Sequence, residues 1–187
     1  MELKRDLMQE KADKLDENIF VADEMISKLV DDYTSSLDEE LNAIRYEVVD
    51  VDEPPITLIE KHFTKLANLI YWVSSDVELV GMWSSIAKAR AKEKYNEAYL
   101  NASNVEDKKK KPTVAELTAI AEGETLYDTT LETIYSIAFK TIKNKIQYAE
   151  MMCNTLSKLY QRRIKESEQI QSRMGRAILN ENIGDAY

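Results

Sequence analysis

Residues 56–80, ITLIEKHFTKLANLIYWVSSDVELV, place apolar side chains alternately three and four positions apart. The repeating positions are Ile56, Ile59, Phe63, Leu66, Ile70, Val73, Val77 and Val80. This heptad-type spacing forms a stripe along one face of an α-helix, and such a stripe packs against a partner helix. The segment therefore predicts a long amphipathic helix, which smaller and aromatic residues extend to about residues 101–104.

The boundary in front of this helix is the pair Pro54-Pro55. Proline cannot continue a helix from the preceding residues, and it holds the residue before it in an extended conformation. Two helices are expected before the boundary, over residues 4–32 and 37–49. The second is predicted to start at Ser36, because Glu39 follows it at the spacing of a capping box.

A second apolar stripe follows the first at helical spacing. Its members are Leu131, Ile134, Ala138, Ile142, Ile146, Ala149, Cys153, Leu156 and Tyr160. They predict a last long helix over about residues 125–173. We expect the two stripes to pair as an antiparallel hairpin and, because a lone hairpin covers each on one side only, a homo-oligomer.

A polar, basic linker over residues 105–112 separates the two long helices. Thr113 then predicts a helix cap, with Glu116 at the capping-box position. We expect a short helix over about 114–122 that ends near Gly123.

The whole sequence contains only 4 Gly and 3 Pro residues, which leaves room for a few long elements. We predict an all-α protein with an acidic helical extension (1–53), a helical hairpin core (56–175) and a loosely held tail (176–187). The N-terminus lacks the apolar core of a secretory signal and the chain lacks a long apolar run, which favours a cytoplasmic protein without a membrane span. The one cysteine, Cys153, is interpreted as a reduced core thiol.

Charge is distributed unevenly along the chain. Residues 1–60 carry 6 basic and 18 acidic side chains, a net of −12, whereas residues 61–187 carry 19 and 16, a net of +3. This asymmetry favours different partners for the two parts, because the sign of a charge steers association. An acidic head folding back on the basic body is a hypothesis that follows from it.

Catalytic motifs are nearly absent. His62 is the only histidine, and Glu60, two residues away, lies on the wrong side of a helix for a shared metal ion. The sequence contains no glycine-rich phosphate loop and no nucleophile elbow. We therefore predict a protein that is not an enzyme and that uses no metal or other cofactor.

Basic residues gather at the end of the first long helix, where aromatic residues lie close by. They are Lys88, Arg90, Lys92 and Lys94, followed by Tyr95 and Tyr99, and in the linker Lys108, Lys109, Lys110 and Lys111. Cations neutralise phosphates and aromatic rings stack on bases, a combination that single-strand binders use. A solvated lysine-rich helix face is the alternative interpretation, and Tyr95 fits a packing role equally well.

The order of these motifs resembles the UvsY family of phage recombination mediators. The triplet Lys88-Ala89-Arg90 within SSIAKARAKEKY (84–95) matches that family, as does KPTVAEL (111–117), the start of a short helix. The closing helix is similar around IQY (146–148) and LYQRR (159–163). The similarity covers about residues 56–170, so the acidic residues 1–55 lie outside it.

This resemblance implies a helical oligomer that binds single-stranded DNA and loads a strand-exchange recombinase onto strands coated with single-strand-binding protein. It assigns phosphate contacts to Lys88 and Arg90, and the charge pattern adds Lys92, Lys94 and 108–111. The alternative is a helical phage protein without DNA binding, either a virion component or an acidic inhibitor.

Overall fold

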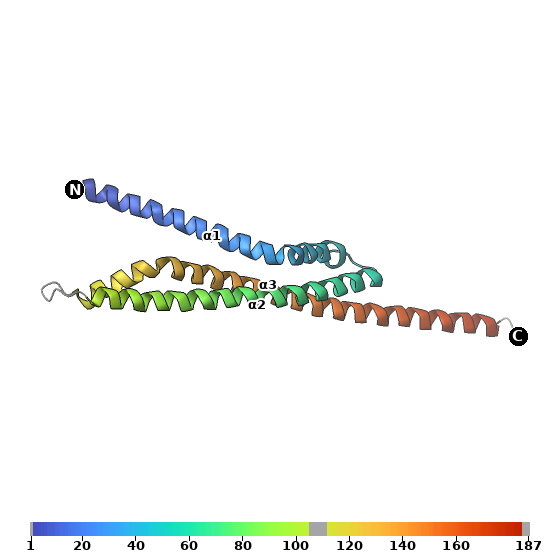
Figure 1. Cartoon of the computed structure of the whole chain (residues 1–187). Helices are drawn as coiled ribbons and strands as arrows, with labels where there is room; N and C mark the ends of the chain where they lie inside the picture. The colour runs from blue at the N-terminus through green and yellow to red at the C-terminus, as the bar shows by residue number, and fades with distance from the viewer. Residues whose placement is uncertain (1, 105–111, 185–187) are drawn as a thin grey trace. The chain divides into compact units, whose positions relative to one another are not determined.

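Three long helices make up the fold in the computed structural model (Figure 1). The structure describes residues 2–104 and 112–184, with side chains described over 20–104 and 112–174. The elements are α1 (Glu2–Ile44), the short π-helix η1 (Arg45–Val49), α2 (Ile56–Ser103) and α3 (Val114–Gly184). Every regular element in these ranges is helical, which confirms the all-α prediction.

The predicted helix starts at Pro54-Pro55 and Thr113 are confirmed. Helix α2 begins directly after the prolines, and the Ile59 amide donates to the Pro55 carbonyl at 3.1 Å. At the start of α3 the Thr113 amide donates to Glu116 Oε2 (2.7 Å), and the Glu116 amide donates to Thr113 Oγ1 (3.3 Å). These reciprocal bonds form a capping box and satisfy backbone donors that the first helical turn leaves open.

Two other predicted ends are wrong. Helix α1 continues through Ser36, and α3 continues through Gly123 and on to Gly184. The physical reason is burial, because the buried positions keep helical spacing across both sites: Val30, Leu37 and Ile44 in α1, and Leu117, Ala121 and Thr125 in α3. Packing of a continuous stripe outweighs a local capping signal, and it outweighs the roughly 1 kcal/mol that an isolated glycine costs in a helix.

Helix α1 ends in the π-helix η1, where the Asp50 amide donates to the Arg45 carbonyl at 2.9 Å. The helical segment thus stops at Val49, the predicted end. The wider turn of a π-helix shifts the following side chains relative to the preceding face.

The chain divides into two compact units, which are described separately. Unit 1 combines Met1–Thr34 with Ser74–Asn144, and unit 2 combines Ser35–Val73 with Lys145–Tyr187. Each unit therefore takes segments from all three long helices. The segment predicted as an N-terminal extension contributes to both.

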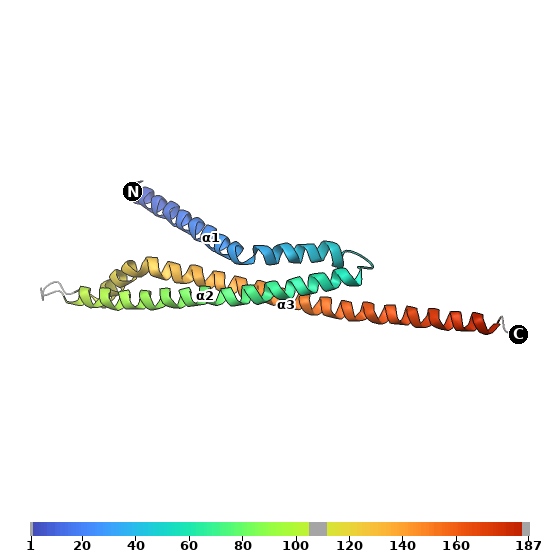
Figure 2. The same ribbon diagram turned by 45° about the vertical axis from the view of Figure 1, so that its right-hand side comes forward.

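In unit 1, α2 and α3 run antiparallel and side by side, as Figures 1 and 2 both show. Glu78 pairs with Lys143 (3.0 Å) and Lys94 pairs with Asp128 (2.5 Å), so residue numbers fall along α3 as they rise along α2. The buried apolar side chains here are mostly small: Val30, Val77, Val80, Ala87, Ala91, Leu117, Ala121, Ile134, Ala138 and Ile142.

In unit 2 the core is built from larger aliphatic side chains of α1, η1, α2 and α3. Its fully buried members are Leu37, Ile44, Val48, Ile59, Leu66, Ala149 and Leu156. An ion pair between Asp38 and Lys145 (2.5 Å) joins α1 to α3 beside this core.

The two predicted apolar stripes are largely buried inside the single chain. Ile59, Leu66, Val73, Val77, Ile134, Ile142, Ile146 and Leu156 are buried, and Phe63, Ile70 and Leu131 are partly buried. A contact between copies of the chain would therefore have to use other residues.

Candidate nucleic-acid interface

The predicted basic residues of α2 lie on two sides of the helix. Lys88, Arg90, Lys92 and Lys94 are all exposed. Residues two positions apart in an α-helix are separated by about 200° around its axis, so Lys88 and Lys92 share one side while Arg90 and Lys94 share the other. The buried Ala87 and Ala91 face the core between these two sides.

Lys94 has an acidic partner in unit 1. Its ammonium lies 2.5 Å from Asp128 Oδ2 of α3, and Asp128 is only 4% exposed. A buried carboxylate needs such a partner, since an unpaired charge away from water is costly. Lys94 thus neutralises a buried acid, whereas Lys88 and Lys92 carry their charge into solvent.

Arg90 lies at the rim of a pocket between α2 and α3 in unit 1. The pocket has a volume of about 200 Å³ and is lined by Trp83, Ile86, Ala87, Arg90, Asp128, Leu131 and Tyr135. The rings of Trp83 and Tyr135 contact each other, with centroids 5.8 Å apart and planes inclined at 53°. The structure therefore places one predicted cation in the lining of the same pocket as two aromatic rings.

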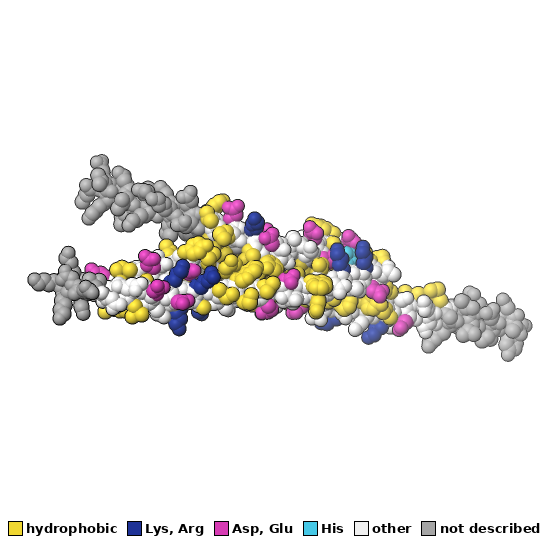
Figure 3. All heavy atoms as spheres, viewed as in Figure 1, with side chains coloured by type: hydrophobic (Ala, Val, Ile, Leu, Met, Phe, Trp, Pro, Cys, Tyr) yellow, Lys and Arg dark blue, Asp and Glu magenta, His cyan; other side chains and the backbone are white. Residues whose placement is uncertain are grey.

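The rings of this pocket differ from Tyr95 and Tyr99, the aromatic residues that the sequence predicts for the DNA surface. Those two rings stack on each other in α2, with centroids 6.3 Å apart. A usable signal was present: Leu79, Met82, Trp83 and Ile86 form a second apolar stripe at helical spacing, and all four side chains are exposed. Figure 3 shows apolar side chains reaching the surface among the charged ones.

The linker lysines Lys108, Lys109, Lys110 and Lys111 lie outside the described residues. Their assignment to a DNA surface stays a prediction.

Unit 2 contains a buried polar cluster that the sequence did not predict. His62 of α2 is 3% exposed and Glu40 of α1 is 1% exposed. His62 Nδ1 lies 2.7 Å from Glu40 Oε1, and Nε2 lies 3.2 Å from Glu47 Oε2 of η1. Carboxylates only accept hydrogen bonds, so both bonds form together when both ring nitrogens carry a proton.

Lys65 completes this cluster, with its ammonium 2.5 Å from Glu40 Oε2. Burial, the largest single influence, raises the pKa of Glu40. The hydrogen bonds and positive charges of Lys65 and His62 outweigh burial, so the pKa is lowered overall. This cluster ties α1 and η1 to α2 and has a structural role in unit 2.

No group of three or more His, Cys, Asp or Glu side chains in the described part of the chain could hold a metal ion. Cys153 is half-buried beside the core of unit 2, and burial raises the pKa of its thiol. A raised pKa keeps the thiol protonated and weakly nucleophilic.

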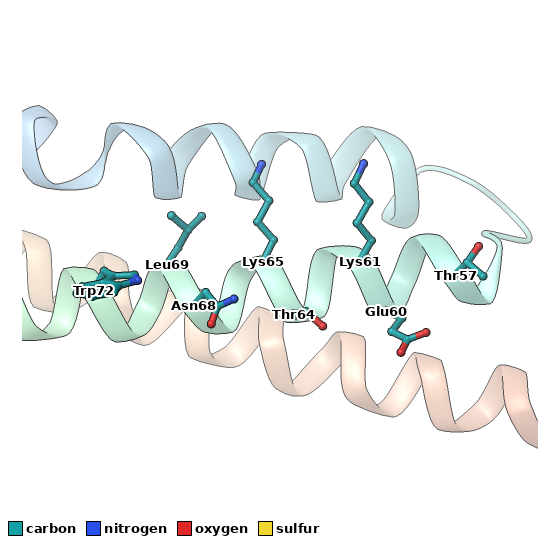
Figure 4. Close-up of a pocket in the computed structure, with 8 residues that line it drawn as sticks. All are labelled: Thr57, Glu60, Lys61, Thr64, Lys65, Asn68, Leu69 and Trp72. Carbon is teal, nitrogen blue, oxygen red and sulfur yellow. The ribbon is translucent and has the colours of Figure 1, made fainter.

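A shallow groove runs along the outer side of α2 in unit 2 (Figure 4). It has a volume of about 590 Å³ and is lined by Thr57, Glu60, Lys61, Thr64, Lys65, Asn68, Leu69 and Trp72. Lys61 and Lys65 point toward α1, whereas Glu60 points to the opposite side of α2. Its charged residues are two lysines and one glutamate, and Lys65 is already paired with Glu40, so the groove lacks the row of free cations expected of a phosphate track.

Comparisons with protein-family models, curated proteins and solved structures gave no match. Among the described residues, no helix is long and apolar enough to serve as a membrane span.

Proposed function

We propose that this chain is a non-enzymatic adaptor that binds single-stranded DNA through unit 1 and helps to load a recombinase onto it. The observation that carries the proposal is the position of Arg90, an exposed cation that lines the same pocket as the rings of Trp83 and Tyr135. Arginine contacts phosphates and aromatic rings stack on bases. The exposed Lys88 and Lys92 lie on the other side of α2 and add positive charge to the same turns.

The resemblance to UvsY-type mediators supports the wider role. Lys88 and Arg90 stand at the two basic positions of the matching triplet. The proposed protein partners are a strand-exchange recombinase and single-strand-binding protein, in the cytoplasm of a phage-infected cell. The acidic residues 1–60, with a net charge of −12, would repel DNA.

Binding of a single-stranded oligonucleotide by the double variant Lys88→Ala/Arg90→Ala tests the proposal. Fluorescence anisotropy at two salt concentrations should show weaker binding and a shallower dependence of log affinity on log salt. Each phosphate contact releases counterions when DNA binds, so fewer counterions are released when a contact is lost. Two lost contacts reduce the slope by roughly 1.4.

The matched control is Lys28→Ala/Lys61→Ala, which removes the same charge from exposed lysines outside the candidate surface. If both double variants bind with the same affinity and salt slope, the DNA assignment fails.

We also propose that the chain forms a homo-oligomer through coiled-coil-like contacts of α3. Leu126 and Ile137 are exposed and stand eleven positions apart, about three helical turns, so they share one side of the helix. Sedimentation velocity should show that Leu126→Glu/Ile137→Glu lowers the mass of the wild-type assembly. A wild-type monomer at tens of micromolar would contradict the oligomer.

The second candidate is a helical interaction protein without DNA binding. The described part of α1 favours it, because Phe20, Val21 and Met25 are exposed beside the exposed acids Asp23 and Glu24. Such a face suits a partner with a basic, partly apolar surface. This candidate predicts no oligonucleotide binding at moderate salt, which the anisotropy titration measures directly.

A further inference from the structure

The pocket between α2 and α3 in unit 1 has apolar walls and two charged groups. Trp83, Ile86, Leu131 and Tyr135 supply most of the apolar surface, and Arg90 and Asp128 supply the charge. Its volume of about 200 Å³ suits one small planar group rather than a folded segment. Concave sites of this composition, with few polar groups among apolar ones, are typical of ligand recognition.

Trp83 is 37% exposed, although its ring packs against Tyr135. One part of the indole is thus fixed by an aromatic neighbour while another part stays accessible. Because the Trp83 ring is already held in place, it loses little conformational entropy when a second planar ring stacks on it. This arrangement suits a nucleobase, whose π-face is available in every sequence.

Asp128 gives the pocket a hydrogen-bond acceptor. Lys94 pairs with its Oδ2 at 2.5 Å, and the second carboxylate oxygen, Oδ1, is an acceptor as well. A carboxylate accepts hydrogen bonds from exocyclic amines of bases, as acidic residues do with the N4 amine of cytosine. Thymine presents no such amine, and its one base donor, the ring N3–H, lies between two carbonyl oxygens that a carboxylate repels, so the acceptor disfavours it.

We propose that this pocket is a subsite for one unpaired base, which stacks on Trp83 and, where it carries an exocyclic amine, donates to Asp128. Arg90 at the rim contacts the phosphate next to that base. The inference rests on the proposed DNA binding and adds a preference for cytosine and adenine over thymine.

The experiment uses the full chain with Trp72→Phe, so that Trp83 is the only tryptophan left of the 2 in the sequence. Oligodeoxycytidine, oligodeoxyadenosine and oligothymidine of equal length are titrated while the Trp83 emission is recorded. Stacking should quench it, and the cytidine and adenosine strands should bind more tightly than oligothymidine.

Trp83→Ala in the wild-type chain should lower affinity for all three strands by about 5- to 150-fold, the range that corresponds to one lost base stack. Trp83→Phe keeps a stacking ring and should retain most of the affinity, which separates stacking from a folding defect. Trp72→Ala, at the other exposed tryptophan, should bind as the wild type does. Asp128→Asn should bring the cytidine-to-thymidine affinity ratio close to one, since an amide also donates.

The outcomes distinguish this subsite from the wider function. If Lys88→Ala/Arg90→Ala weakens binding while Trp83→Ala and Trp72→Ala bind alike, the subsite is overturned and the DNA-binding proposal stands. Equal affinity for all three strands in the wild type overturns the role of Asp128. If no strand binds the wild type even at low salt, both proposals are overturned.

Discussion

Unit 1 and unit 2 use the same three helices but bury different kinds of side chain. The buried apolar residues of unit 2 are mainly leucine and isoleucine, such as Leu37, Ile59 and Leu66. Those of unit 1 are mainly alanine and valine, such as Ala87, Ala138 and Val77. Both units leave large side chains exposed, for example Trp83 in unit 1 and Trp72 in unit 2. Large buried side chains contribute most to stability, and large exposed ones are available to partners.

This difference indicates a division of roles. Unit 2 adds a buried ionic cluster around His62 to its aliphatic core, so its segments are held by two kinds of interaction. Unit 1 has a lighter core and carries the cations and aromatic rings proposed to bind DNA. We therefore expect substitutions in unit 2 to act mainly on stability and those on unit 1 to act mainly on binding.

The largest effect on stability is expected from Glu40→Ala. It leaves the buried His62 without the carboxylate at its Nδ1, and removal of one partner of a buried pair costs about 3–5 kcal/mol of the free energy of unfolding. Urea denaturation measures the loss, and hydrogen exchange should localise it to unit 2. The exposed neighbour Glu39→Ala is the control; an equal loss in both variants would refute the structural role of the cluster.

The next largest loss of unfolding free energy is expected from substitutions in the two cores. Leu66→Ala in unit 2 should cost about 2–5 kcal/mol, the usual range for a buried leucine. Val77→Ala in unit 1 removes fewer atoms and should cost about 2 kcal/mol or less, at about 0.8 kcal/mol per buried methylene. Hydrogen exchange, read peptide by peptide, assigns each loss to its unit. A larger loss for Val77→Ala would reverse the proposed division.

A smaller effect concerns the pH dependence of unit 2. The pKa of Glu40 is lowered from its usual value of 4.5, so the folded state binds a proton less readily than the unfolded state. The charged carboxylate of Glu40 thus stabilises the fold fully at pH values above the unfolded-state pKa. This stabilisation is lost as the pH falls through the lower folded-state pKa. Wild type and Glu40→Gln should differ in unfolding free energy at pH 7 and converge on acidification. A difference that persists in acid would rule out this linkage.

The smallest effects are expected at two helical glycines of unit 1. Gly123→Ala should stabilise α3 by about 0.5–1 kcal/mol, because no atom beyond the neighbouring residues and backbone of its own helix lies within 4 Å of the added Cβ. In Gly81→Ala the Cβ would stand 2.8 Å from the Phe139 ring, so the ring must move and the gain should be smaller. Thermal denaturation compares the stability of the two variants. A greater gain in stability for Gly81→Ala would show that the Phe139 ring moves freely.

The sequence predicted those features that depend on neighbouring residues. Pro54-Pro55 and the Thr113–Glu116 capping box act over one helical turn, and the apolar stripes repeat within one helix. Continuity of α1 at Ser36 and of α3 at Gly123 was not predicted, because burial against other helices decides it.

The candidate site was predicted in part for the same reason. Lys88 and Arg90 were named from a local triplet and a resemblance. The pairing of Lys94 with Asp128 joins residues 34 positions apart, and that of His62 with Glu40 joins residues 22 apart. Such pairs depend on the register between antiparallel helices, which the spacing of a single stripe leaves open.

The buried ring of His62 has a practical consequence for spectroscopy. It is the only imidazole in the sequence, so its ring protons give NMR signals that need no assignment by mutagenesis. Its contacts come from α1 and η1, so those signals change when either segment leaves α2. The protein thus carries a built-in reporter of local opening in unit 2, readable by isotope labelling of histidine during a titration with unlabelled DNA or an unlabelled protein partner.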